Sequence, residues 1–139
     1  MANDEQAVER LNQVNQDRLP GMIGMIVTYA EPGVLMRAKM EAAPKLIAPI
    51  GFLFAPSIVA LADTLCAYGM KLPPGANGFT TAELKCNFMS TVREGNVLCE
   101  AKLVHGGRTT QVWDATITAE ATGKLMALFR CTQIILYPK

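Results

Sequence analysis

The chain has 139 residues, enough for one domain that buries about two thirds of the surface that its unfolded form exposes. Half of the residues are hydrophobic, only 18% are charged, and the formal net charge is +1. This balance excludes the strong positive field that gathers nucleic acid, so we expect a single domain over residues 1–139 with no nucleic-acid partner.

The N-terminal segment predicts a surface helix over about residues 3–18. Val8, Leu11 and Val14 recur at helical spacing among polar side chains, which is typical of a helix with one apolar stripe. The sequence LPG at residues 19–21 is expected to end it. The segment lacks the continuous apolar run of a secretory signal, so we expect a cytoplasmic protein.

The remainder of the chain predicts a hairpin, a central helix and a four-strand meander. Residues 42–51 form a loop rich in proline and glycine, after which Pro56 suits the first turn of a helix that runs to about Tyr68. Gly69 can cap that helix. Strands are expected over residues 22–30, 34–41, 79–88, 96–104, 109–119 and 125–136. One long helix among antiparallel strands implies an α+β fold whose sheet wraps the central helix.

The cysteines and the single histidine do not predict a metal site. No two cysteines form a CxxC pair, and His105, which is expected in a surface turn, has no partner at ligand spacing. In a reducing cytoplasm the thiols are expected to stay free and to fill the core. The uncharged run over residues 46–62 is interrupted by two prolines and a glycine and is too short to span a membrane. The cysteines are Cys66, Cys86, Cys99 and Cys131.

Asp63 is unexpected in the middle of the predicted central helix. Apolar residues occupy nearly every direction around that helix, which is therefore expected to be buried on most sides. No lysine or arginine occurs between Lys45 and Lys71, and an unpaired carboxylate in apolar surroundings is costly. Either Asp63 reaches solvent or a subunit boundary, or it has a function. The free N–H groups at residues 55–58 suit an oxyanion, so the combination suggests acyl transfer.

Several segments together resemble the hotdog-fold acyl-CoA thioesterases of the phenylacetic-acid-degradation type. The resemblance runs from Leu11 to Leu136 and implies a hotdog fold, an antiparallel sheet wrapped around a long central helix. The matching segments are LPGMIGM at 19–25 for the opening strand, PIGFLFAPSIVALAD at 49–63 for the loop and central helix, TAELKCNF at 81–88 for the third strand, VREG at 92–95 for the next turn and VHGGRTT at 104–110 for the junction of the fourth and fifth strands.

The resemblance also implies a catalytic set around Asp63. In that family an Asp or Glu follows the histidine of a His-Gly-Gly motif by nine residues, and Asp63 stands at the same spacing from Phe54. Asp63 is thus the implied nucleophile or general base, and the backbone N–H of Ala55 is the implied oxyanion donor. Thr81 matches a Ser or Thr that helps to hold the lytic water, and Thr64, beside Asp63, completes the candidate set.

The chain departs from that pattern at three positions. Phe54 replaces the histidine, Pro56 the second glycine, and Ala48 an Asn or Gln that usually contacts the site. Each hydrogen bond lost from the transition state costs about 10-fold to 1000-fold in rate. Two functions therefore stay open, hydrolysis of an acyl-CoA thioester by Asp63 and non-catalytic or weakly catalytic binding of acyl-CoA. Hydratase chemistry is least favoured, because it needs a histidine beside the acid.

For coenzyme A, the resemblance implies a pantetheine tunnel between two subunits with basic residues at its mouth. Arg93 and Arg108 match those positions, and arginine suits phosphate. Phe54, Tyr68 and Phe88 are the candidates for contact with the acyl group. We therefore expect a homo-oligomer, either a dimer with shared active sites or a tetramer built as a dimer of dimers, with no cofactor and no membrane partner.

Overall fold

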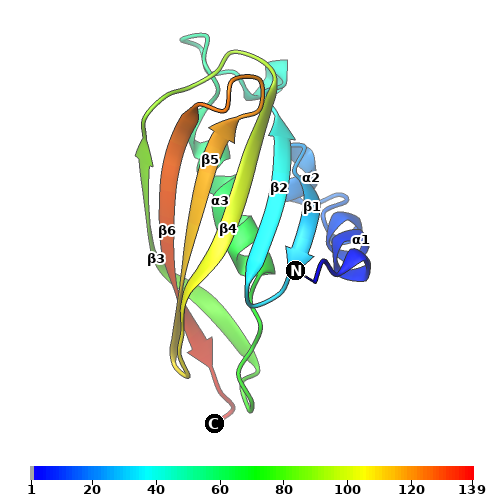
Figure 1. The fold of residues 1–139 in the computed structure, drawn as a ribbon, viewed down its shortest axis with the longest axis vertical. Coiled ribbons are helices and arrows are strands. Elements are labelled where there is room, and N and C mark those ends of the chain that lie inside the picture. Colours follow the sequence, from blue (N-terminus) through cyan, green and yellow to red (C-terminus); the bar gives the residue numbers. More distant parts are fainter. Residues whose placement is uncertain (1) are drawn as a thin grey trace.

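Six antiparallel strands form one sheet in the structure, a computed structural model that describes residues 2–139 (Figure 1). In space the strands follow the order β1-β2-β4-β5-β6-β3, so β1 and β3 are the two edges. The strands are β1 (Ile26–Glu31), β2 (Leu35–Glu41), β3 (Gly78–Phe88), β4 (Asn96–Gly106), β5 (Thr110–Ala119) and β6 (Leu125–Leu136). Strands β4, β5 and β6 follow one another as expected, but the expectation of a four-strand meander is wrong for β3. This strand pairs with β6 and not with β4, so the loop between β3 and β4 crosses the end of the sheet.

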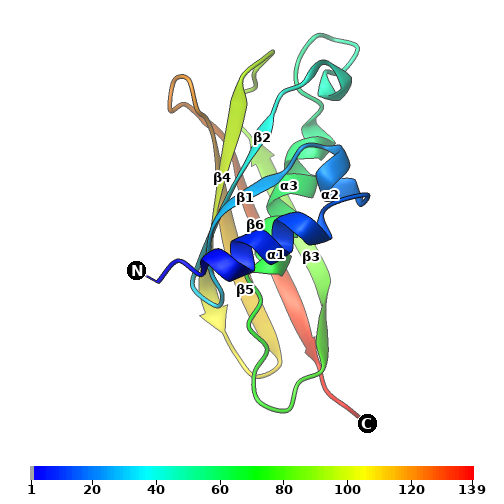
Figure 2. The same cartoon turned by 90° about the vertical axis from the view of Figure 1, so that its right-hand side faces the viewer.

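Helix α3 (Ala55–Tyr68) lies inside the curve of this sheet and contacts five of its strands, from β2 to β3 (Figures 1 and 2). Phe54 before it is extended, Pro56 occupies its first turn, and Gly69 follows its last residue, as the sequence predicts. The structure therefore confirms the expected α+β arrangement of an antiparallel sheet wrapped around a long helix.

Only one side of α3 is buried within the chain. Ile58, Leu61 and Leu65 are at most 2% exposed, and full burial of such a side chain contributes about 1.5–3 kcal/mol. Asp63 and Thr64 are only half-buried. The expectation of a helix buried on most sides is wrong for a single chain, because the face with Asp63 adjoins the edge strand β3 and is only half-buried.

Helix α1 (Glu5–Val14) lies along β1 and covers that edge of the sheet (Figure 2). The side chain of Asn12 pairs with the edge as a strand would. Its Oδ1 accepts a hydrogen bond from the Val27 N–H at 2.8 Å, and its Nδ2 donates to the Val27 carbonyl at 3.0 Å. Farther along, Asn3 Oδ1 accepts from the Ala30 N–H at 3.0 Å. The N-terminal segment thus satisfies backbone groups that an edge strand leaves open.

The segment between α1 and β1 differs from the prediction. Helix α1 ends at Val14 rather than near residue 18, and Asp17 adopts a left-handed φ of 60°, which a right-handed helix does not continue. Pro20 then suits the first turn of a second helix, α2 (Leu19–Met22), where the opening strand was expected. Gly24, with a φ of 79°, turns the chain into β1.

Two other segments have more regular structure than the sequence predicts. The loop before α3 contains a short 3-10 helix, η1 (Pro44–Leu46), followed by a bridge that pairs Ile47 with Leu53. At the other end of the sheet, β4 continues to Gly106, so the exposed His105 lies in a strand rather than in a turn. Backbone pairing with β5 extends this hairpin beyond the residues whose side chains favour a strand.

The edge strand β3 is left uncovered in a single chain. Leu84 and Phe88 pair with the buried Cys131 and Ala127 of β6, which places them on the inner face of the sheet. They are nevertheless 42% and 48% exposed. An apolar inner face beside an open strand edge is typical of a surface that a second chain covers.

Candidate active site

Asp63 and Thr81 meet between α3 and β3. Asp63 lies in the third turn of α3, on the face turned away from most of the sheet, and Thr81 lies on β3 directly before a β-bulge. Thr81 Oγ1 is 3.4 Å from Asp63 Oδ1, which makes a long hydrogen bond. The structure therefore brings together the predicted acid and the predicted water-holding threonine.

The surroundings of Asp63 favour its protonated form. Burial raises the pKa of this carboxyl above its ordinary value, and the hydrogen bond from Thr81 offsets part of that rise. Among the described residues, no lysine, arginine or histidine forms an ion pair with Asp63. A desolvated carboxylate without a cationic partner is a stronger base than one in water, which suits a general base or a nucleophile.

Gln133, which is not among the residues predicted from the sequence, is fully buried next to Thr81. Thr81 Oγ1 lies 3.1 Å from Gln133 Oε1, closer than to Asp63. The sequence contained a clue to this residue. Gln133 follows Phe129 and Cys131 at intervals of two along β6, so it points to the same inner face of the sheet as these two buried residues. A polar side chain at an apolar position of that kind needs a hydrogen-bond partner.

The predicted oxyanion donor lies at the far end of α3. Ala55 is the first residue of the helix, and within residues 2–139 no group accepts a hydrogen bond from its N–H. At a rise of about 1.5 Å per residue, Ala55 and Asp63 are about 12 Å apart along the helix axis. The two groups of one chain are therefore too far apart to act on the same thioester carbonyl.

Phe54 stands where the resemblance has a histidine, and it is 50% exposed directly before α3. Its carbonyl accepts hydrogen bonds from the Ser57 N–H at 2.9 Å and from Ser57 Oγ at 2.6 Å, which fixes the turn into the helix. Its ring supplies neither a donor nor an acceptor. The start of α3 thus offers a substrate backbone N–H groups beside an apolar ring.

The three remaining catalytic and acyl-contact candidates are not gathered in one place. Thr64 is half-buried beside Asp63, and Phe88 is exposed at the end of β3. Tyr68 donates a hydrogen bond to Asn15 Oδ1, so it joins the end of α3 to the turn after α1. Of these three, only Thr64 adjoins Asp63 in a single chain.

Arg93 and Arg108 lie at opposite ends of the sheet. Arg93 belongs to the loop between β3 and β4, and Arg108 to the turn between β4 and β5, so the length of β4 separates them (Figure 1). Arg93 lies over the Phe52 ring at 4.4 Å, and Arg108 lies with Lys71 beside a cavity of about 490 Å³. The two arginines of one chain do not form a common phosphate site.

Cys66 and Cys99 are packing residues of the core rather than reactive groups. A hydrogen bond to Cys131 and burial raise the pKa of Cys66, and burial raises the pKa of Cys99, so both remain neutral thiols. Within residues 2–139, no three His, Cys, Asp or Glu side chains group closely enough to hold a metal ion. In the same part of the chain, no helix combines the length and the apolar character that a membrane crossing requires.

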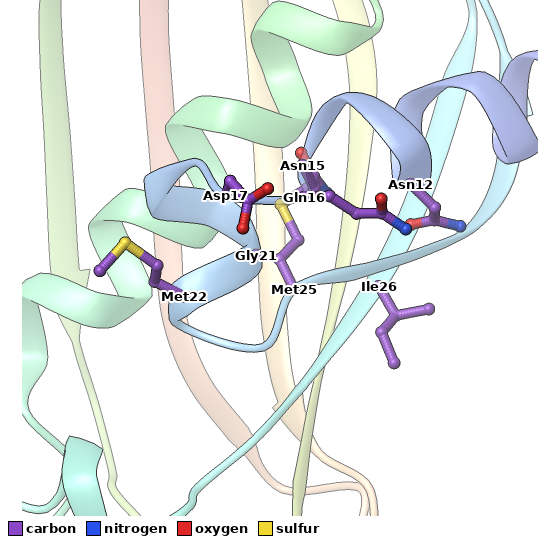
Figure 3. A pocket seen from close by; sticks show the side chains of 8 residues that line it. All are labelled: Asn12, Asn15, Gln16, Asp17, Gly21, Met22, Met25 and Ile26. Carbon is purple, nitrogen blue, oxygen red and sulfur yellow. The ribbon is translucent and has the colours of Figure 1, made fainter.

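A cavity of about 610 Å³ lies between α1, α2 and the start of β1 (Figure 3). Only part of its polar lining is engaged. Asn12 bonds to β1 and Asn15 Oδ1 accepts from Tyr68, whereas Asn15 Nδ2 is buried without a hydrogen-bond partner among the described residues. Exposed Met22 and Ile26 form part of its rim. Asp63 does not line this cavity, so the half-buried acid lies elsewhere on the chain.

Two comparisons by sequence identify relatives of the chain. A family model described as the thioesterase superfamily matches residues 50–126, a span that includes all of α3 and β3. The 1,4-dihydroxy-2-naphthoyl-CoA hydrolase of Listeria monocytogenes is 31% identical over 112 residues, which cover 79% of this chain and 89% of that protein.

Solved structures resemble the fold over nearly its whole length. A thioesterase from Haemophilus influenzae superposes with a TM-score of 0.84 at 26% identity and covers 94% of this chain and 90% of its own. The PaaI protein from the phenylacetic acid degradation operon of E. coli gives a TM-score of 0.79 at 18% identity, with 95% and 94% covered. These likenesses confirm the hotdog fold that the sequence predicts.

Proposed function

Since this chain belongs to the thioesterase superfamily, we propose that it hydrolyses an acyl-CoA thioester to a free acid and coenzyme A, with Asp63 as general base or nucleophile. The observation that carries this proposal is the contact between Asp63 and Thr81 on a face of α3 that is open in a single chain. The coenzyme A thioester in the name of the Listeria relative supports the substrate class.

The chemistry has two versions that use the same residues. As a general base, Asp63 takes a proton from water held by Thr81 while the water oxygen attacks the thioester carbonyl. The carbon–sulfur bond then breaks, and the proton on Asp63 passes to the leaving thiolate of coenzyme A. As a nucleophile, the Asp63 carboxylate attacks the carbonyl itself, and coenzyme A leaves as a thiolate that takes a proton from solvent. Water then hydrolyses the resulting anhydride and restores Asp63. In both versions a backbone N–H such as that of Ala55 stabilises the oxyanion.

The proposed site is shared between two copies of the chain. Ala55 and Asp63 of one chain are about 12 Å apart along α3, whereas both must lie within a few ångströms of one thioester carbonyl. If β3 pairs with β3 of a second copy, the two helices lie on the same side of a continuous sheet and run in opposite directions. The start of one α3 then approaches Asp63 of the partner subunit.

The same pairing brings the two candidate phosphate ligands to one end. Antiparallel pairing of β3 with itself places the loop with Arg93 at the same end of the joint sheet as Arg108 of the partner subunit. Each arginine lies against an aromatic ring in its own chain, Phe52 for Arg93 and Tyr137 for Arg108. The guanidinium groups are then available to the phosphates of coenzyme A.

A panel of acyl-CoAs that includes aromatic and medium-chain thioesters tests the activity through release of free thiol. Asp63→Asn is expected to lower kcat at least 100-fold, because it keeps the size of the side chain and removes its basicity. Asp17→Asn is the matched control, since Asp17 is exposed and its left-handed φ tolerates asparagine. Hydrolysis by Asp63→Asn at the wild-type rate would contradict the mechanism.

A non-catalytic or weakly catalytic acyl-CoA-binding protein is the second candidate function. Phe54 and Ala48 favour it, because neither supplies a polar side chain at the start of α3. Such a protein would bind a thioether analogue of acyl-CoA, which cannot be hydrolysed, with equal affinity before and after Asp63→Asn. It would release no thiol from any member of the panel.

A further inference from the structure

A row of polar side chains crosses three strands on the inner face of the sheet. The register pairs Thr81 of β3 with Gln133 of β6, and Gln133 with Gln111 of β5. Gln111 is fully used, because it donates to the Lys71 carbonyl at 3.1 Å and accepts from Trp113 Nε1 at 3.2 Å. Gln133 is 0% exposed, and its amide oxygen faces Thr81.

Thr81 has one hydroxyl proton and two acceptors within reach. Its Oγ1 lies 3.1 Å from Gln133 Oε1 and 3.4 Å from Asp63 Oδ1. A hydroxyl can rotate about its C–O bond and donate to either acceptor, but not fully to both. The remaining contact of Gln133 is weak, since its Nε2 donates to a thiol sulfur, Cys131 Sγ at 3.6 Å, and sulfur is a weak acceptor. The carboxylate of Asp63 and the neutral amide oxygen of Gln133 therefore compete for the hydroxyl proton of Thr81.

We propose that Gln133 is a positioning residue for Asp63, which acts by offering the Thr81 hydroxyl a second acceptor when Asp63 loses its negative charge. The inference rests on the proposed function, in which Asp63 loses its charge either by taking a proton from water or by forming an anhydride. In the ionised state Thr81 donates to Asp63. When the charge is gone, the hydroxyl turns to Gln133 and stays hydrogen-bonded.

The consequence is a more basic carboxylate. A hydrogen bond donated to the charged form of a carboxyl group lowers its pKa, and a competing acceptor weakens that effect. Without Gln133, Thr81 would donate to Asp63 throughout and favour the charged form. Gln133 thus supports the loss of charge that both versions of the reaction require, without touching the substrate.

Few other groups bear on this carboxyl. Cys66 on α3 and Cys131 on β6 are the titratable side chains that face Asp63, and both are buried in the core. No ion pair of the described residues includes Asp63. Changes at Gln133 or Thr81 should therefore appear directly in the titration of Asp63.

The test is the titration of Asp63 by carboxyl-carbon NMR in the unliganded protein, followed by pH profiles of kcat and KM. Gln133→Met keeps the volume and removes the acceptor. We expect it to lower the pKa of Asp63 by about half a unit to one unit and to move the acidic limb of the kcat profile by the same amount. The plateau of kcat should fall several-fold, with KM unchanged.

Two sets of variants separate this role from a merely structural one. Thr81→Val should raise the pKa of Asp63, and adding Gln133→Met to Thr81→Val should cause no further shift, because the shared hydroxyl is gone. Gln111→Met, the same loss one strand farther away, should lower stability and leave the titration of Asp63 unchanged. If Gln133→Met fails to fold, Gln133→Asn, whose amide is too short to reach Thr81, should give the same shift.

An unchanged pKa of Asp63 in a folded Gln133 variant would overturn the inference. So would an equal shift in the presence and absence of the Thr81 hydroxyl. The titration needs no substrate, so it also distinguishes two failures. If the wild type hydrolyses no acyl-CoA while the titration responds as expected, the proposed function is wrong and the coupling of Gln133 to Asp63 stands.

Discussion

At the scale of single residues, Asp63 combines two properties that are opposed energetically. It lies on a half-buried helix face where no described residue forms an ion pair with it, and burial raises the pKa of its carboxyl. A residue of this kind lowers stability when it is charged and gains basicity in return, which is a common property of catalytic acids and bases. The loss of stability and the proposed catalytic role both result from the burial of the Asp63 carboxyl.

This opposition predicts that Asp63→Asn stabilises the protein near neutral pH. Because the pKa is raised in the folded state, folding favours the protonated carboxyl, and the ionised form costs stability at any pH above the raised pKa. The cost disappears as the pH falls below the ordinary value of about 3.9, where the carboxyl is protonated in both states. Urea unfolding of Asp63→Asn and wild type from pH 7 down to pH 3.5 measures the difference.

The expected result is a gain in unfolding free energy for Asp63→Asn that is largest at pH 7 and shrinks toward pH 3.5. Asp17→Asn, at an exposed position, should show no such trend. A variant that is less stable than wild type at pH 7 would mean that the carboxylate makes favourable contacts in the folded protein. The proposal that burial destabilises the Asp63 carboxylate and makes it more basic would then be wrong.

The sequence predicted part of this site. Asp63 was evident from its charge within an apolar helix, and the resemblance added Thr81 and Ala55. Gln133 was missed because its partner Thr81 is distant in sequence, and only the register of β3 with β6 makes them neighbours. The separation of Arg93 from Arg108 was missed for the same reason, since the direction of each strand decides at which end a loop lies.

At the scale of elements, α1 acts as a substitute for a seventh strand. Asn12 presents an amide to β1 with the same donor and acceptor that a backbone peptide offers, and it bonds to both polar groups of Val27. A buried core position, Ala7 at 1% exposure, holds the helix against the sheet. The side chain of Asn12 therefore closes an edge that would otherwise pair with another strand.

Asn12→Ala is expected to destabilise the protein by about 1–3 kcal/mol, because it leaves two backbone groups of a partly covered strand without partners. Hydrogen exchange should accelerate at the Val27 amide. Gln13→Ala, at the exposed neighbour on the same helix, is the control and should change stability by less than about 0.5 kcal/mol. Equal effects of the two substitutions would argue against an edge-sealing role for Asn12.

Helices and strands could be predicted where the local preferences of the residues match the conformation that they adopt in the folded chain. The limits of α3 follow from Pro56 and Gly69, and the β5–β6 part of the meander follows from its β-branched residues. The segment LPGM was assigned to a strand, but Pro20 and the left-handed backbone at Asp17 make it a short helix. One turn of helix leaves no periodicity for a sequence pattern to reveal.

At the scale of the whole molecule, one chain leaves two apolar or half-buried surfaces uncovered. The inner face of β3 exposes Leu84 and Phe88, and the side of α3 that carries Asp63 is open. The two surfaces are neighbours, because Asp63 of α3 contacts Thr81 of β3. A second copy paired through β3 would cover both at once, so we predict a homodimer in solution, with a mass by light scattering of twice that of the chain.

Mixed dimers test whether the sites are shared. Asp63→Asn removes the acid, and Ala55→Pro removes the backbone donor at a helix position that proline suits, behind a Phe54 that is already extended. Each variant alone should be inactive. If each site combines Ala55 of one subunit with Asp63 of the partner subunit, random exchange should restore about a quarter of wild-type activity, from one intact site in each mixed dimer.

Sites built from one chain give the opposite outcome, because every site of a mixed dimer then carries one of the two substitutions and the mixture stays inactive. Exchange itself is checked by mass, using a tag on one variant. A monomeric mass at micromolar concentration would exclude the shared site before any activity is measured.

The unequal edges of the sheet also limit how far association can proceed. A sheet that is open at both edges resembles a bifunctional monomer, because every addition leaves a new reactive end and a fibre results. Here α1 blocks β1 while β3 stays open, so the chain is monofunctional along the hydrogen-bonding direction. The first addition, β3 to β3, consumes both reactive ends. The product carries a blocked β1 at each extremity, and in this direction polymerisation terminates at two chains.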